Sequence, residues 1–180
     1  MQTRETIQSS SVNHRRILWE CSPQGFYKIN WDVAVDKKVC KIVIGVFVRD
    51  EHGNFLATLK EKQDSLPDPL LAEALAARRA ARRAARRAAR FGLELGMYRV
   101  ILEGNSQTVV NEVKQMQQNQ GYFGMIISDL KATLDQYDEW KICHINCEGN
   151  SVAHDLGKCT LLVTDYIVEL EENPNCFQSM

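Results

Sequence analysis

The sequence predicts an α/β fold, and three observations support this prediction. Residues 26–60 contain three short apolar runs separated by turns, which is typical of an antiparallel meander. After Pro69 the pattern changes to helical, and from Met97 onward strand-like and helical segments alternate. The length of 180 residues is sufficient for one domain with a hydrophobic core.

The first predicted strand is Phe26 to Asp36, with the sequence FYKINWDVAVD. Large and small side chains alternate along it with a period near two, which indicates a strand that is buried on both faces. Asp32 stands in this apolar setting, and burying an unpaired charge is costly. We therefore expect Asp32 to lie at the open end of the strand or to face a cation. From this strand alone, a partly solvated Asp32 that pairs with a nearby Lys or Arg is an equally good interpretation.

Two further strands complete the predicted meander. The turn Asp36–Lys38 leads to a second strand, Cys40–Val48, and the turn Arg49–Asn54 leads to a third, Phe55–Lys60. Gly45 lies inside the second strand, where the missing side chain allows another group to approach the sheet closely.

A long helix is predicted from Leu70 to Phe91, closing at Gly92. Its central part is a tandem repeat, AARRAARRAARRAAR, at residues 76–90, and both residue types favour helix. The four-residue repeat drifts by about 40° per unit against the helical turn, so the alanine and arginine stripes wind around the axis. We therefore expect that no single face stays buried and that the far end of the helix projects beyond the domain.

The repeat concentrates positive charge on one element. Seven of the 22 basic residues lie in this stretch, which has no acid, so the rest of the chain carries 15 basic against 23 acidic residues. Two interpretations remain open: a solvated helix face, or a face that contacts phosphate groups.

The second half of the chain alternates between strands and helices. The predicted elements, in order, are a strand Met97–Glu103, a helix Gln107–Gln118, a helix Met125–Tyr137, a strand Trp140–Cys147 and a helix Ser151–Leu162. Asn105 or Ser106 is expected to cap the first of these helices. The stretch from Tyr166 to Met180 is acidic and is expected to be loose.

The composition favours a protein inside the cell. No apolar run approaches the roughly 20 residues of a membrane span, and residues 1–24 are polar without the apolar core of a signal peptide. We interpret residues 1–24 as a tail or linker. The six cysteines lack the spacing of a disulfide framework or a zinc site, so free thiols are expected.

Polar residues at strand ends and helix starts form an ordered set: Asp32, Glu73, Asn105 and His154. With the segments around them, they resemble the ribonuclease H family, most closely the plant reverse-transcriptase-like domains related to retrotransposons. The matching segments are KINWDVAV, GVFVRDEHGNFLA, LAEALAAR, VILEGNSQTVV, HINCEGNSVAHDLGK and ENPNC. They place the domain at residues 25–176, followed by a short end at 177–180.

The resemblance implies a ribonuclease H-like fold, with a five-stranded mixed sheet and helices on both faces. It implies hydrolysis of the RNA strand of RNA–DNA hybrids by a monomer, with two Mg²⁺ ions that activate water and stabilise the phosphorane. Asp32 matches the carboxylate that bridges both ions, Glu73 matches the helix glutamate, and Asn105 falls where the family has a third carboxylate. His154 falls at the position of a fourth acid, where the plant domains commonly have His. These four are the expected catalytic and metal-binding residues.

The expected nucleic-acid contacts lie around this set. Lys37 and Lys38 follow the first strand, where the family's substrate backbone passes, although a solvated turn is an alternative. Ser106 and Asn150 are the other two residues expected to contact nucleic acid.

Asn105 is the first departure from the family pattern. An amide oxygen can coordinate Mg²⁺ but lacks the charge that offsets dehydration of the ion, so the second ion should bind poorly. Glu103, two residues earlier on the same strand face, leaves a partial replacement open. The open functional alternatives are a hybrid endoribonuclease, a binding module without activity and a retrotransposon relic.

The length of the first helix is the second departure. Glu73 and Asn105 are 32 positions apart, about eight more than the family usually has, which adds roughly 12 Å of helix. We expect the Glu73 end to keep its register and the surplus to bulge or protrude between Phe91 and Met97.

Overall fold

The computed structural model describes residues 20–36, 41–64, 73–115, 122–160 and 166–170, so Lys37 and Lys38 lie outside the described residues. The strands are β1 (Tyr27–Asp36), β2 (Lys41–Arg49), β3 (Phe55–Asp64), β4 (Arg99–Gly104), β5 (Glu139–His144) and β6 (Tyr166–Leu170). The helices are α1 (Glu73–Glu94), α2 (Gln107–Lys114), α3 (Tyr122–Leu134) and α4 (Ser151–Thr160).

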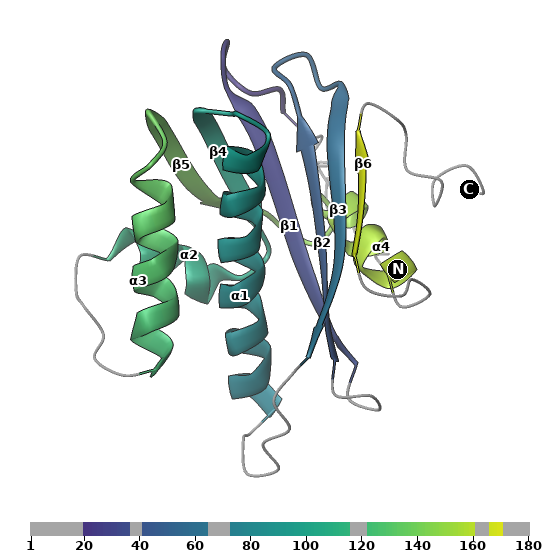
Figure 1. The fold of residues 1–180 in the computed structure, drawn as a ribbon, viewed down its shortest axis with the longest axis vertical. Coiled ribbons are helices and arrows are strands. Elements are labelled where there is room, and N and C mark those ends of the chain that lie inside the picture. The colour runs from purple at the N-terminus through teal and green to yellow at the C-terminus, as the bar shows by residue number, and fades with distance from the viewer. Residues whose placement is uncertain (1–19, 37–40, 65–72, 116–121, 161–165, 171–180) are drawn as a thin grey trace, which may run out of the picture.

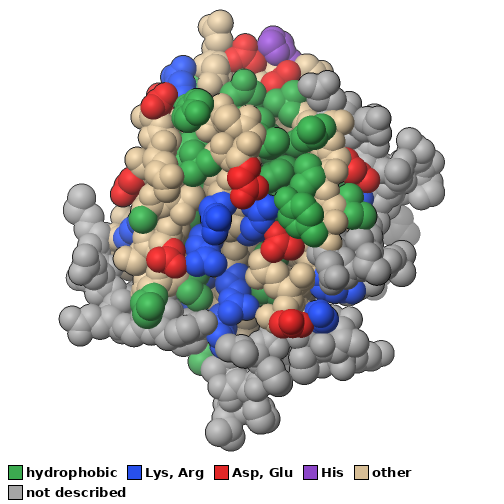
Figure 2. Space-filling model, in the orientation of Figure 1, with side chains coloured by type: hydrophobic (Ala, Val, Ile, Leu, Met, Phe, Trp, Pro, Cys, Tyr) green, Lys and Arg blue, Asp and Glu red, His purple; other side chains and the backbone are tan. Residues whose placement is uncertain are grey.

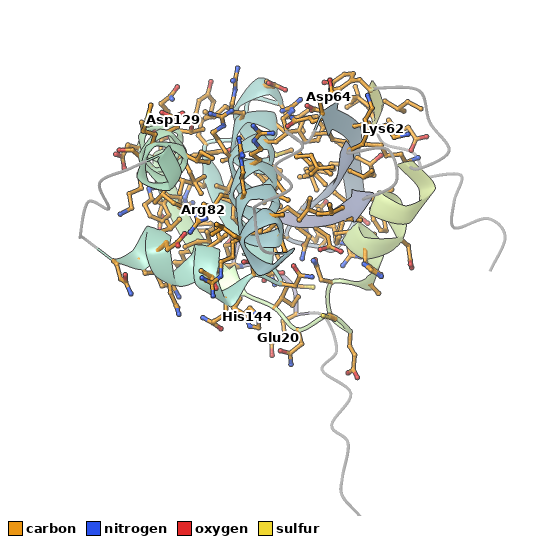
Figure 3. The ribbon with its side chains drawn as sticks, turned by 90° about the horizontal axis from the view of Figure 1, so that it is seen from below. Glu20, Lys62, Asp64, Arg82, Asp129 and His144 are labelled. Atoms are coloured by element: carbon orange, nitrogen blue, oxygen red, sulfur yellow. The ribbon has the colours of Figure 1, made fainter. Side chains whose placement is uncertain are left out.

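The strands form one mixed sheet in the order β5-β4-β1-β2-β3-β6 (Figure 1). The pairs β1–β2 and β2–β3 are antiparallel, while β4 runs parallel to both β1 and β5. Helices α1, α2 and α3 lie on one side of the sheet, and α4 covers β1 and β2 from the other side (Figure 3). The predicted α/β fold, with its meander, its parallel strands and its helices on both faces, is confirmed.

The sixth strand was not predicted. The acidic stretch from Tyr166 onward is expected to be loose, but its first five residues form β6, which pairs antiparallel with β3. Glu169 holds this pairing through an ion pair with Lys60, at 3.2 Å between carboxylate and ammonium groups, and accepts a hydrogen bond from Thr58. These partners lie more than 100 positions away in the sequence, so a local pattern gives no sign of them.

The core follows from the two-sided covering of the sheet. On the side of α1, Ile29, Trp31, Ile44 and Leu102 are fully or almost fully buried with the alanines of the helix. On the side of α4, a smaller cluster is formed by Phe47, Ala153 and Leu156. The central strand β1 is therefore buried on both faces, as its pattern predicts.

Helix α1 does not project from the domain as expected. Six alanines of the repeat are at most 5% exposed: Ala80, Ala81, Ala84, Ala85, Ala88 and Ala89. At 100° per residue they spread over about half of the helix circumference. The sheet on one side and α3 on the other bury this whole half, which accommodates the drift of the repeat. The small alanine side chain allows this close packing against both layers.

The predicted end of α1 at Gly92 is also wrong. The helix continues to Glu94, and the glycine that closes it is Gly96, which has a φ of 73° and follows the helix in a left-handed turn. The amide of Met97 donates to the carbonyl of Gly92, so the chain passes directly into β4 without a bulge. Gly92 serves close packing instead, since a Cβ atom there would collide with Ile29 and Tyr137.

The arginines of the repeat divide into two groups. Arg82 and Arg87 are mostly buried; Arg82 forms a two-pronged ion pair with Glu112 of α2, and Arg87 pairs with Glu61 of β3. Burial lowers the pKa of Arg87, but hydrogen bonding to Glu61 and the charges of Glu61 and Glu94 outweigh this effect and raise it. These two arginines hold α1 to its neighbours.

The end of β4 is fixed by Trp31. Gly104 pairs with Trp31 in the parallel register, and a Cβ atom at Gly104 would overlap the indole ring. The glycine therefore allows the fully buried indole to lie against β4.

Two further predictions concern the cysteine thiols and membrane-spanning segments. Cys21, Cys143 and Cys147 are free, as expected. In the described part of the chain, no helix combines the length and apolarity that a membrane span needs.

We predict that Arg82→Gln lowers the free energy of unfolding by about 3 kcal/mol, because it leaves Glu112 without its partner in a mostly buried position. Urea denaturation measures the change. The adjacent Arg83→Gln is the matched control and should change stability by no more than about 0.5 kcal/mol. Equal effects of the two substitutions would contradict the structural role of Arg82.

Gly104→Ala should destabilise the fold by about 1–3 kcal/mol through overpacking against the Trp31 indole. Thermal unfolding followed by circular dichroism tests this. If the collision with the indole is the cause, the double variant Gly104→Ala, Trp31→Leu loses less stability than the sum of the losses in the two single variants. Strictly additive losses would refute this cause.

Candidate functional site

The site is centred on Asp32, which lies in the middle of β1 and is 4% exposed. Its Oδ2 atom lies 2.9 Å from Nδ1 of His154, in the first turn of α4. The glycine predicted to allow close approach, Gly45, is the register partner of Asp32 on β2. In the described structure, Asp32 thus faces an imidazole, and the interpretation of a solvated Asp paired with Lys or Arg does not apply.

Asn105 and Ser106 follow the end of β4. The last residue of this strand, Gly104, pairs with Trp31, so Asn105 stands one step further, beside the position of Asp32 on the neighbouring strand. Both residues are partly buried. Ser106 occupies the N-cap position of α2, but its side chain makes no capping hydrogen bond. The chain therefore leaves β4 at Asn105, one residue beyond the strand position that pairs with Trp31.

Glu73 is the first residue of α1, and the structure does not describe its side chain. Because α1 passes into β4 through a tight hydrogen-bonded turn, the bulge expected between Phe91 and Met97 is absent. Arg82 is tied to α2 by Glu112, and Glu73 starts nine residues earlier, about 13 Å along the helix axis. In Figure 1 the first turn of α1 lies below the level of α2.

A buried polar network lies beside Asp32 on the same face of β1. Lys28 and Glu103 form an ion pair with 2.9 Å between nitrogen and oxygen, and both side chains are at most 10% exposed. The amide nitrogen of Asn30 donates to Glu103 at 3.2 Å. Arg49, the last residue of β2, also interacts with the charge of Glu103: burial lowers the pKa of its guanidinium group, and the negative charge of Glu103 acts to raise it. Glu103 is therefore held by internal partners, which argues against its partial replacement of a carboxylate at Asn105.

Asn150 links α4 to this network. It is 1% exposed, its Nδ2 donates to the Trp31 carbonyl at 2.9 Å, and its Oδ1 accepts from Asn30 at 3.2 Å. Its own carbonyl accepts from the amide of His154. The side chain that was expected to contact nucleic acid is thus used inside the protein, where it fixes the start of α4 against β1.

Sequence reasoning missed the roles of Lys28 and Asn30. Lys28, Asn30 and Asp32 alternate along β1, which places three polar side chains on one face of a buried strand. This period-two polar pattern was the available signal. Only the positions of Glu103 and Asn150, distant in sequence, show which partners Lys28 and the amide nitrogen of Asn30 bind.

The expected magnesium site can be tested against this donor set. Asp32 provides a carboxylate and Asn105 an amide oxygen, which are hard ligands that suit Mg²⁺, whereas imidazole suits softer metals. Among the described residues, no three His, Cys, Asp or Glu side chains come together as a metal site. Asp32 and Asn105 therefore have the donor chemistry for a hydrated Mg²⁺ ion, and the described residues do not provide the carboxylates for two ions.

Comparison with solved structures supports the fold. The chain is similar to RNase H1 from the archaeon Halobacterium salinarum, with a TM-score of 0.66, 16% identity, and 77% of this chain and 99% of that chain covered. It is also similar to the N-terminal RNase H domain of a Mycobacterium tuberculosis protein, with a TM-score of 0.59, 14% identity, and coverage of 76% and 96%. A third similar structure is LC11-RNase H1 in complex with an RNA/DNA hybrid, with a TM-score of 0.55, 20% identity, and coverage of 73% and 94%.

Comparison of the sequence identifies the family. No curated protein matches the chain. The model of the family described as reverse transcriptase-like matches residues 30–160, which is well over half of the chain and contains all four residues of the ordered set. The chain therefore belongs to the reverse transcriptase-like family, and its domain has the ribonuclease H-like fold.

Proposed function

We propose that this domain binds RNA–DNA hybrids at the site formed by Asp32, Asn105 and His154, and that its Mg²⁺-dependent cleavage of the RNA strand is slow. The observation that carries the proposal is the hydrogen-bonded Asp32–His154 pair, and the uncharged Asn105 follows the end of the neighbouring strand β4. The similar solved structures include LC11-RNase H1 and part of a foamy viral protease-reverse transcriptase, 23% of whose chain is covered, and both are in complex with an RNA/DNA hybrid. These complexes support a hybrid as the ligand.

The proposed role of His154 is to hold Asp32 and to move a proton. Asp32 is nearly buried, so its carboxylate needs the hydrogen bond that Nδ1 of His154 donates at 2.9 Å. The imidazole is half exposed, with 51% of its side chain accessible, so its second nitrogen can exchange a proton at a bound backbone. The anchor at Asn150 keeps the imidazole in this position.

Asp32 and Asn105 would hold the magnesium ion. When bound, Mg²⁺ supplies an activated water and offsets charge on the phosphodiester. Asn105 contributes no charge, so the ion keeps more water and binds weakly. The Asp32 carboxylate would also remain hydrogen-bonded to His154, which weakens its binding of the ion further.

A binding module without hydrolysis is the second candidate. The observation that favours it is the start of α1, since Glu73 begins about 13 Å along the helix axis from Arg82. If Glu73 is too distant from Asp32, the site has one charged ligand and binds the hybrid without cleaving it. The two candidates differ in how they respond to a restored carboxylate at position 105.

We expect Asn105→Asp to increase the rate of hybrid cleavage by at least about tenfold, because it restores a charged metal ligand. Cleavage of a hybrid labelled in its RNA strand, at several millimolar Mg²⁺, measures this. The matched control Asn105→Ser should give no increase, and Asp32→Asn should abolish cleavage in either background. If Asn105→Asp binds the hybrid but does not cleave it faster, the binding-module candidate holds and the slow-nuclease proposal is wrong.

Magnesium should stabilise Asn105→Asp more than the natural protein. At an ion concentration about ten times the dissociation constant, binding to the folded state adds roughly 1.4 kcal/mol, which raises the melting temperature. Thermal shift in EDTA and in Mg²⁺ measures the difference without any need for activity. Asp32→Asn should remove the increase in melting temperature caused by Mg²⁺. An equal increase in all three proteins would show that the ion does not bind at Asp32.

A further inference from the structure

The arginine repeat presents a second charged surface, separate from the Asp32 site. Figure 2 shows Lys and Arg side chains gathered over the middle of the face that carries α1. A hollow of ≈ 450 Å³ lies beside the helix, and two acids and five cations line it: Glu61, Glu94, Lys62, Arg83, Arg86, Arg87 and Arg90. Asp32 and His154 lie on the other side of the sheet, where α4 packs.

Three arginines of this surface are available to a ligand. Arg86 forms an ion pair with Asp129 of α3, but the two side chains are 37% and 59% exposed, so the pair is weak. Arg83 donates to the backbone carbonyl of Asp64, and Arg90 is exposed. Within the described residues, neither Arg83 nor Arg90 forms an ion pair with a carboxylate. Figure 3 shows Asp129 and Asp64 on opposite sides of α1, with Arg82 toward α2.

These three side chains form a row along the helix. Arg83, Arg86 and Arg90 share the outer face of α1, and the steps between them are about 4.5 and 6 Å along the axis. Both steps are shorter than the Debye length at physiological salt, so the three charges act together on one ligand. Guanidinium groups bind phosphate oxygens in a planar, two-pronged geometry, which makes a phosphodiester chain the ligand that suits the row.

An exposed aromatic ring lies beside the row. Tyr166 at the start of β6 lines the same hollow and is 53% exposed, with its ring 5.8 Å from the Arg87 guanidinium. Arg87 also donates to the tyrosine hydroxyl at 3.2 Å, which holds the ring in place. Unpaired bases stack on such rings, while the bases of a duplex are already stacked on each other.

We propose that the α1 row binds a single strand of nucleic acid, with its phosphates on Arg83, Arg86 and Arg90 and one base on Tyr166. An acidic peptide would use the arginines but has no base for the ring. The proposal depends on the proposed function only in expecting nucleic acid at this domain. It is otherwise independent, because the row and the Asp32 site share no residue.

The charge part of the proposal is tested with Arg83→Gln combined with Arg90→Gln, which breaks no side-chain ion pair of the described structure. The probe is a labelled oligouridine RNA of about 12 nucleotides, followed by fluorescence anisotropy. We expect affinity at about 50 mM salt to fall at least about tenfold and the slope of log K against log salt to decrease by about 1.4. Lys114→Gln combined with Lys141→Gln is the matched control, since both residues are exposed cations, on α2 and β5, that form no ion pair with a described carboxylate, and the change in net charge is the same.

The stacking part is tested with Tyr166→Leu against Tyr166→Phe. Loss of the ring should weaken binding by about fivefold or more, while Phe keeps the ring and should bind like the natural protein. Three outcomes would each overturn the proposal. The charge variant and its control could lose equal affinity, or the Leu and Phe variants could bind RNA equally well. The third is competition by polyglutamate that is as strong as competition by RNA. Hybrid binding by the natural protein and by Asp32→Asn is measured in parallel. Loss of hybrid binding in Asp32→Asn with intact oligouridine binding separates the two surfaces. Absence of hybrid binding by the natural protein would refute the proposed function, whatever the result with oligouridine.

Discussion

The structure depends on the satisfaction of polar groups that are buried on one face of the central strand. Lys28, Asn30 and Asp32 of β1 are all at most 7% exposed, and each has a partner from a distant part of the chain. Glu103 of β4 pairs with Lys28, and Asn150 and His154 of the α4 region hold Asn30 and Asp32. An unpaired polar group in this setting is costly, so the network fixes β4 and α4 relative to β1. The candidate site is the end of this network that reaches solvent.

The same principle explains the repeat helix. A run of alanine and arginine has no large apolar side chain, yet α1 packs against the sheet and α3, and its alanines belong to the main hydrophobic core. Alanine allows the sheet and α3 to approach closely, and Arg82 and Arg87 add ion pairs with α2 and β3. In each of two units of the repeat, one arginine is fixed inside the fold and the other faces solvent. The helix can therefore serve both as a structural element and as a charged surface.

Much of the fold could be predicted because periodicity and turn residues are local signals. The five predicted strands and four helices are present, and two of the four expected site residues, Asp32 and His154, form a hydrogen-bonded pair. The end of α1 was misplaced because a glycine can close a helix or allow close packing, and only the neighbours of Gly92 distinguish these roles. Asn150 was assigned to nucleic acid for a similar reason: an amide can bind a ligand or satisfy buried groups, and the sequence does not show which groups surround it.

The sequence by itself determined the α/β class, the order of the elements and the identity of the polar residues, because these follow from side-chain chemistry and spacing along the chain. The tertiary structure decided which polar groups bind one another, that β6 joins the sheet, and that α1 passes into β4 without a bulge. These outcomes depend on contacts between segments that are far apart in the sequence. Such contacts contribute to stability only once the layers have packed together.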